Sequence, residues 1–275
     1  MSDSASPQID ASVPHSARIW NYWLGGKDNY AVDREVGDEF LAIFPGQAAI
    51  ARHSRAFLRR AVYYLAAEAG IRQFLDIGTG LPTADNTHQI AQQVAPDARI
   101  VYVDNDPVVL SHARVLLTST PQGACDYIDA DVRDWAAILD GAAKTLDFTR
   151  PVALILLGIL GHIPDEDGPE QIVAHLVDAL APGSYLVIND GTNVLAGPQE
   201  GPAADDTARA RAIRRYVEAG GVPYHLRTPA RIEGMFAGLE LIPPGVVSVS
   251  RWHPEPGPFA EPAEVDAFCG VARKP

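Results

Sequence analysis

The chain has 275 residues, of which 47% are hydrophobic and 21% charged, and its formal net charge is −13. This composition is typical of a globular protein with a substantial core, and no apolar run approaches the ~18 residues of a membrane span. An acidic surface repels a phosphate backbone, so neither nucleic acid nor a membrane is the expected partner. The N-terminal sequence MSDSASPQID lacks a basic-then-apolar signal, which favours a cytoplasmic location.

The first 70 residues differ in pattern from the rest of the chain. Residues 1–14 are rich in Ser, Asp and Pro and are expected to be disordered. Residues 15–70 are expected to form a helical cap, because an aromatic-rich segment precedes apolar residues spaced as on a helix over residues 47–69. Residues 71–275 form the expected main domain. The two isolated cysteines, Cys125 and Cys269, indicate neither a disulfide framework nor a metal site.

After Gly70 the pattern alternates between apolar strands and amphipathic helices. Strand, helix and strand joined by short connections predict an α/β fold with a parallel sheet. The five expected strands are residues 73–77, 99–104, 125–130, 152–157 and 185–188, with helices near 84–94, 107–117, 134–143 and 169–180. Residues 191–206 are expected to form a loop, followed by helices over 207–219 and from Thr228, and by strands near 245–251 and 266–272.

Three polar motifs follow the first three expected strands. Asp76-Ile77-Gly78-Thr79-Gly80 contains glycines that allow a tight turn and the close approach of a ligand. Asp104 ends the second strand, where a carboxylate can accept both hydrogen bonds of a ribose diol. Asp131 follows the third strand and can accept a hydrogen bond from an adenine amine. Because ligands of open α/β sheets bind at the carboxyl ends of the strands, these motifs predict a nucleoside site.

The glycine motif bears on which nucleoside cofactor binds. A dinucleotide fingerprint needs a third glycine, but Thr83 stands at that position. Pro82 removes an N–H donor that a pyrophosphate would use. Asp76 would face a phosphate badly, whereas it could reach the ammonium of an amino-acid tail. These features favour S-adenosylmethionine over NAD.

The segments DIGTG, VDNDP and DADVR resemble the class I S-adenosylmethionine-dependent methyltransferases. The segments SARIWNYWLGGKDNYAVDRE, RQFLDIGTGLPT, VYVDNDPVVLSHAR and LAPGSYLVI are more narrowly similar to an actinobacterial S-adenosyl methyltransferase family, formerly a domain of unknown function. The resemblance covers about residues 15–273. It implies a Rossmann-like three-layer sandwich whose seven-stranded, mostly parallel sheet has an antiparallel last strand over residues 266–272.

The resemblance also implies a set of cofactor-binding residues. They are Tyr22, Gly26, Lys27, Asp76, Gly78, Thr79, Gly80, Asp104, Asn105, Asp131 and Val132, with the N-terminal segment closing over the cofactor. The chain departs from the family pattern at Ser54, where asparagine is usual. It also departs at Asn189 and Asp190, which replace a Ser-His pair.

Three residues are candidates for catalysis, since they follow the fourth and fifth strands. His162 could act as a general base, while Asn189 and Asp190 could orient an acceptor. Tyr224, His225 and Arg227 precede a helix and could belong to a lid.

The leading hypothesis is O- or N-methylation of an unidentified small molecule with S-adenosylmethionine as cofactor and S-adenosylhomocysteine as product. A non-catalytic or regulatory protein that binds these nucleosides is the alternative, and an NAD-dependent oxidoreductase is the third hypothesis. The sequence does not determine the oligomeric state, and a homodimer is one option.

Overall fold

The computed structural model describes residues 10–82, 85–116, 119–195, 206–255 and 262–275. Residues 1–9 of the expected disordered N-terminus and 196–205 of the expected loop lie outside this part of the chain. The five strands predicted in the first part of the main domain are all present within a few residues of their expected bounds. They are β1 (Gln73–Ile77), β2 (Arg99–Asp104), β3 (Ala124–Asp129), β4 (Ala153–Leu157) and β5 (Tyr185–Gly191).

The five strands are parallel and lie in the order β3-β2-β1-β4-β5. The sheet continues through β8 (Ala267–Arg273), which runs antiparallel to β5, as expected for the last strand. The expected count of seven strands needs a correction, because the described residues contain eight. The two-residue strands β6 (Glu240–Leu241) and β7 (Val247–Ser248) both pair with β8. They share the edge position that one continuous strand would fill.

The strand expected near residues 245–251 is therefore reduced to β7. The chain bends away directly after it, because the N–H of Arg251 donates to the carbonyl of Ser248. β5 extends three residues beyond its expected end, since the antiparallel partner β8 pairs with it as far as Gly191.

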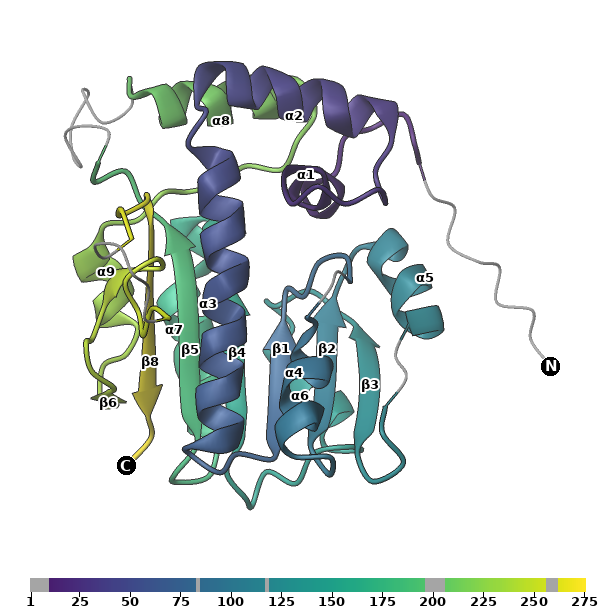
Figure 1. Cartoon of the computed structure of the whole chain (residues 1–275), viewed down its shortest axis with the longest axis vertical. Helices are drawn as coiled ribbons and strands as arrows, with labels where there is room; N and C mark the ends of the chain where they lie inside the picture. Colours follow the sequence, from purple (N-terminus) through teal and green to yellow (C-terminus); the bar gives the residue numbers. More distant parts are fainter. Residues whose placement is uncertain (1–9, 83–84, 117–118, 196–205, 256–261) are drawn as a thin grey trace.

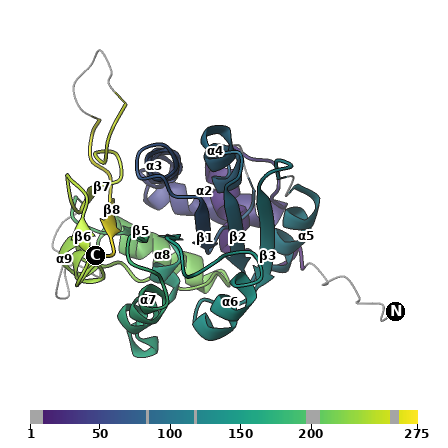
Figure 2. The same ribbon diagram turned by 90° about the horizontal axis from the view of Figure 1, so that it is seen from below.

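Helices cover both faces of the sheet, which gives the expected three layers (Figure 2). On one face, α3 (Gln47–Ala67) and α4 (Thr87–Val94) contribute Phe57, Leu65 and Ile90 to the core. On the other face, α6 (Trp135–Ala142), α7 (Pro169–Asp178) and α9 (Pro229–Gly234) contribute Ile138, Leu176 and Ile232. α5 (Pro107–Leu116) lies beside β3.

The ends of α3 and α9 illustrate how the sequence sets helix boundaries. α3 ends before Gly70, which adopts a left-handed conformation with φ of 72°. The N–H of Ile71 then donates to the carbonyl of Leu65, which satisfies a carbonyl of the last turns of α3. Thr228 caps α9, since its side chain accepts a hydrogen bond from the N–H of Arg231.

Three helices lie over the carboxyl edge of the sheet (Figure 1). They are α1 (Ser16–Trp23), α2 (Ala31–Ile43) and α8 (Ala208–Glu218). We refer to these three helices as the lid. They share a small core of Ile19, Val36, Phe40, Ala212 and Tyr216.

The lid cuts across the expected division of the chain at residue 70. α8, which lies in the expected main domain, packs against α2 of the expected cap. Most of α3, which lies in the expected cap, packs on the sheet. Of the residues expected to be disordered, 1–9 lie outside the described part of the chain. Among residues 10–14, the carbonyl of Val13 accepts a hydrogen bond from Arg18. Among the described residues, none of the helices has the length and apolar character needed to cross a bilayer.

Candidate active site

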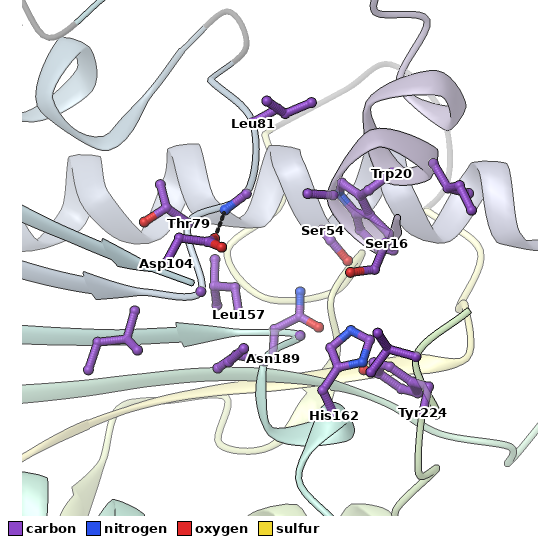
Figure 3. Close-up of a pocket in the computed structure, with 18 of the residues that line it drawn as sticks. Ser16, Trp20, Ser54, Thr79, Leu81, Asp104, Leu157, His162, Asn189 and Tyr224 are labelled. Atoms are coloured by element: carbon purple, nitrogen blue, oxygen red, sulfur yellow. Dashed lines mark hydrogen bonds between the residues drawn. The ribbon is translucent and has the colours of Figure 1, made fainter. Parts of the chain in front are cut away.

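A cavity of about 510 Å³ lies at the carboxyl edge of the sheet, beneath the lid. Its floor comes from residues at or just after the ends of β1 to β5. Its walls include residues of α1, α3 and α8. Figure 3 shows Asp104 and Thr79 on one side of this space and His162, Asn189 and Tyr224 together on the other. The volume lies in the usual range of small-molecule sites.

The predicted glycine motif forms one end of the cavity. Gly78 and Gly80 both adopt left-handed conformations, with φ of 77° and 66°. A Cβ at Gly78 would lie 2.6 Å from Cβ of Ile159, so a larger residue cannot stand there without rearrangement. Apart from its two chain neighbours, a Cβ at Gly80 would meet no atom of the described residues within 4 Å. The backbone is therefore turned tightly at Gly78 and open to a ligand at Gly80.

Asp104 lies next to this loop, as predicted from its place at the end of β2. Its Oδ2 accepts a hydrogen bond from the N–H of Gly80 at 2.7 Å, and its Oδ1 accepts one from the N–H of Asp106 at 3.0 Å. Burial raises the pKa of Asp104, and these two N–H groups oppose that rise. A carboxylate has about four acceptor positions, so two remain for a ligand diol.

Asp76 is buried at the base of the glycine loop. Its Oδ2 accepts a hydrogen bond from Oγ1 of Thr87 at 2.6 Å. Burial raises its pKa from 3.8 to about 6, against the opposing effects of Thr87 and of the Arg55 guanidinium. Arg55 also lines the cavity, although no motif in the sequence singles it out.

Asn105, Asp131 and Val132 line the cavity beyond Asp104. Nδ2 of Asn105 donates to Oδ2 of Asp131 at 3.1 Å, which joins the ends of β2 and β3. Arg133 donates to both oxygens of Asp131, at 2.8 and 2.7 Å, and this contact lowers the Asp131 pKa. The residues that follow β1, β2 and β3 therefore form one continuous part of the cavity lining, as the sequence predicted from their places at successive strand ends.

The predicted contacts from the N-terminal segment need a correction. Tyr22, Gly26 and Lys27 are not among the residues that line the cavity. The hydroxyl of Tyr22 donates to Asp38 at 2.7 Å, Lys27 is exposed, and Gly26 packs closely over the side chain of Asn21. The cavity is lined instead by His15, Ser16, Trp20, Trp23 and Leu24, among others.

A helical signal could have identified this face of α1. Ser16, Trp20 and Trp23 recur at the i, i+4 and i+7 spacing of one helical stripe, whereas Tyr22 falls outside it. The segment does close over the cavity, although through other residues than those the resemblance implied.

His162 and Asn189 line the opposite end of the cavity, as their positions after β4 and at the end of β5 predicted. Nδ1 of His162 lies 3.0 Å from the carbonyl oxygen of Pro223. Because a carbonyl only accepts, Nδ1 carries the hydrogen, and in the neutral ring Nε2 is an acceptor. Burial lowers the pKa of His162, and the Pro223 contact opposes that effect. The ring stands edge-on to Tyr224, with centroids 5.0 Å apart.

Asp190 does not line the cavity, which corrects its predicted place among the acceptor-binding residues. It is fully buried, accepts a short hydrogen bond from the Tyr224 hydroxyl, and pairs with Arg227 at 3.1 Å. Arg227 in turn donates to the carbonyls of Leu160 and Ile163, both at 2.7 Å. Asp190 therefore supports the turn that carries His162 from beneath.

Tyr224 and Arg227 belong to the group suggested as lid residues, but Tyr224 lines the cavity beside His162 and Arg227 is buried beneath it. A Cβ at Gly161 would lie 2.2 Å from the Tyr224 ring, so glycine is needed for that ring to pack. His225 adds only a backbone hydrogen bond, from its N–H to the carbonyl of Gly161 at 2.7 Å.

The residues at the glycine end fit an adenosine that carries an amino-acid tail. The open space beside Gly80 admits a ligand to the backbone, Asp104 keeps acceptor positions for a diol, and buried Asp76 offers a carboxylate for an ammonium group. The fold and this site define a class I S-adenosylmethionine-dependent methyltransferase.

The chain belongs to the S-adenosyl methyltransferase family, which it matches over residues 2–275. It is 46% identical to a DUF574 family protein of Streptomyces avermitilis, with a TM-score of 0.88 over 98% of this chain and all of that one. It is also 39% identical to a protein of Thermobifida fusca assigned as a methyltransferase, with a TM-score of 0.85 over 99% of both chains.

Curated relatives match a shorter segment. A Mycobacterium avium protein assigned as an S-adenosylmethionine-dependent methyltransferase is 30% identical over 49% of this chain and 42% of its own length. The trans-aconitate 2-methyltransferase of Escherichia coli is 28% identical over 44% of this chain and 39% of its own length. The chain therefore spans less than half the length of these two relatives. The cofactor of the family is S-adenosylmethionine, as the sequence predicted.

Proposed function

We propose that this protein transfers the methyl group of S-adenosylmethionine to an oxygen or nitrogen of a small molecule, with His162 as general base. The observation that carries this proposal is the hydrogen bond from Nδ1 of His162 to Pro223, which leaves Nε2 as a proton acceptor. His162 lines the same cavity as the glycine loop and Asp104. The proposed base and the proposed cofactor-binding surface thus face one cavity.

The glycine end of the cavity would hold the cofactor. Asp104 would accept hydrogen bonds from the ribose, and Asp131 with the N–H of Val132 would bind the adenine edge. Asp76 would receive the ammonium of the methionine part beside the Gly78–Gly80 turn. When bound there, the cofactor supplies an electrophilic methyl group on a positively charged sulfur.

The chain's own residues perform the remaining tasks. Asn189 and Tyr224 flank His162 and restrict where an acceptor can lie (Figure 3). His162 accepts the acceptor's proton at Nε2 as the new bond to carbon forms. An acceptor bound beneath the lid would be shielded from water, and its alignment there would supply a large part of the rate acceleration.

The test measures cofactor binding and turnover separately. Calorimetry of the full chain with S-adenosylmethionine should show saturable binding, and an assay for S-adenosylhomocysteine should detect turnover with an accepted small molecule. The His162→Ala variant should lose about 10²–10⁴-fold in turnover and keep its cofactor affinity. His175, which stacks on Trp135 and is not among the cavity residues, gives the matched control His175→Ala.

Two results would contradict the proposal. The first is His162→Ala turnover equal to that of the unmodified chain. The second is cofactor binding without turnover for any hydroxyl or amine tested, which would favour the non-catalytic alternative.

A further inference from the structure

The part of the cavity beneath the lid is lined by apolar and aromatic side chains. α1 contributes Trp20 and Trp23, Leu24 follows directly after it, α2 contributes Phe40, and α8 contributes Ile213. The rings of Trp20 and Trp23 meet edge-on with centroids 6.0 Å apart, and Phe40 lies 5.0 Å from Trp23. This surface comes from three helices and faces one space.

Several of these side chains are only partly buried. Trp20, Trp23 and Leu24 are intermediate in exposure although they line a cavity, whereas Phe40 is buried. Large apolar side chains that keep contact with solvent inside a cavity gain free energy when an apolar ligand covers them. Aromatic rings in edge-on and tilted arrangements also accept a further ring between or against them.

The polar groups at this end differ in kind from those at the cofactor end. His162 and Asn189 present a neutral imidazole and an amide to the cavity, whereas Asp190, next to Asn189 in the chain, is buried and is not among the described residues that line it. Arg209 also lines the cavity, is buried, and donates through Nη1 to the carbonyl of Thr192 at 2.6 Å.

We infer that the methyl acceptor is a planar aromatic hydroxyl compound, whose ring lies under the lid and whose hydroxyl faces His162. The inference rests on the proposed function and adds the substrate class. The apolar rings of the lid bind the ring system, and the base lies where the hydroxyl must lose its proton.

The base distinguishes a phenol from other acceptors. A phenol with pKa near 10 is a weak nucleophile at neutral pH until a base removes its proton. A carboxylate is already ionised at neutral pH, so it gains nothing from a base at His162. A neutral aromatic amine can attack before it loses a proton, so it gains less from His162.

The transfer balances without any further reactant. The phenol proton passes to Nε2 of His162, and the oxygen forms a bond to the methyl carbon. The bond from that carbon to sulfur breaks, and its electron pair stays on sulfur. The products are an aryl methyl ether, S-adenosylhomocysteine and a protonated His162, which then releases its proton to water.

The test uses the full chain and four probes of similar size: 2-naphthol, 2-naphthoic acid, 2-naphthylamine and 2-decalol. Binding is followed by tryptophan fluorescence with S-adenosylhomocysteine present, and turnover by S-adenosylhomocysteine release with S-adenosylmethionine present. We expect 2-naphthol to bind saturably and at least 10-fold tighter than 2-decalol. We also expect it to turn over at least 10-fold faster than the acid or the amine.

Matched variants locate the binding. Trp20→Leu should weaken 2-naphthol binding about 3–10-fold, and Trp20→Phe should restore most of it. Trp135→Leu should leave binding unchanged, because Trp135 stacks on His175 and is not among the residues that line the cavity. Thermal unfolding of each variant shows that it is folded.

Each outcome has a separate meaning. Equal binding of 2-decalol, or faster turnover of the acid or amine, overturns the aromatic hydroxyl class while the methyltransferase function stands. Absence of saturable 2-naphthol binding also overturns it. Failure of S-adenosylmethionine to bind overturns the proposed function itself.

Discussion

Asp104 at the end of β2 accepts a hydrogen bond from the backbone N–H of Gly80 at 2.7 Å, and this contact joins the carboxylate to the glycine loop after β1. A second N–H, from Asp106, donates to the other carboxylate oxygen at 3.0 Å. The carboxylate is therefore held in one orientation before a ligand arrives. Such preorganisation reduces the entropy cost of binding a ribose.

Replacing Asp104 with Ala should weaken S-adenosylmethionine binding about 10–100-fold. The variant loses charge-assisted hydrogen bonds, each worth roughly 1.5–3 kcal/mol, and frees the Gly80 loop. Calorimetry on the purified chain measures the change in affinity.

Asp129 provides the matched control. It pairs with Asp104 in the sheet register but is exposed and is not among the cavity residues. Asp129→Asn should leave the affinity within about 2-fold. Unchanged affinity in Asp104→Ala would contradict the assignment of the ribose site.

The raised pKa of Asp76 predicts a pH dependence of stability. Between its ordinary pKa of 3.8 and about 6, the folded state binds a proton that the unfolded state releases. Asp76 therefore makes the protein progressively less stable as pH rises through this window, by about 3 kcal/mol in total. Asp76→Asn removes this titration. The free energy of unfolding of the variant, relative to that of the unmodified chain, should therefore increase from pH 4 to pH 7.

Urea unfolding at several pH values measures this difference. Above pH 7 the difference between the two proteins should become constant, since Asp76 is then ionised in both states. If the difference in free energy of unfolding between the two proteins does not change between pH 4 and 7, the pKa of Asp76 is not raised.

His162 predicts the acid limb of the activity profile. Burial lowers its pKa below the ordinary value of 6.5, so the ring is neutral and able to accept a proton at neutral pH. Turnover should stay constant as pH falls to about 6.5 and decline only below that value. The residual turnover of His162→Ala should lack this limb. If the turnover of His162→Ala still declines below about pH 6.5, a group other than His162 is responsible for the decline.

The lid depends on a buried ion pair between α1 and α2. Nε of Arg18 lies 2.9 Å from Oδ2 of Asp33, and both side chains are at most 3% exposed. Asp33→Asn should destabilise the lid by about 3–5 kcal/mol, because it leaves the buried Arg18 charge without its carboxylate partner. Hydrogen exchange of α1 and α2 should report the loss.

The exposed pair of Arg215 and Glu39, 3.0 Å apart, links α8 to α2 and provides the control. Glu39→Gln should change stability by less than about 1 kcal/mol, since solvent screens this pair. Similar effects of the two substitutions would mean that burial does not determine the strength of the Arg18 contact.

The glycine turn, Asp104 and Asp131 could be predicted to meet, because the carboxyl ends of successive parallel strands share one edge of a sheet. His162 and Asn189 follow the same rule. Whether Tyr22 and Lys27 face the cavity could not be predicted in this way. A motif shows only which residues are adjacent in sequence, whereas the face of α1 that meets the cavity depends on how the helix packs on the rest of the protein. Asp190 was misplaced for a similar reason, as its burial depends on Arg227 and Tyr224, which lie 37 and 34 residues away.

By itself, the sequence determined the parallel sheet, the polar motifs that follow its successive strands, and the cofactor of the family. Strand alternation and glycine spacing are local properties of the chain. Only the tertiary structure decided that α8 completes the lid with α1 and α2, that Trp20 rather than Tyr22 faces the cavity, and that Asp190 supports His162 from below. These are contacts between distant segments, and their geometry arises from packing that minimises exposed apolar surface over the whole molecule.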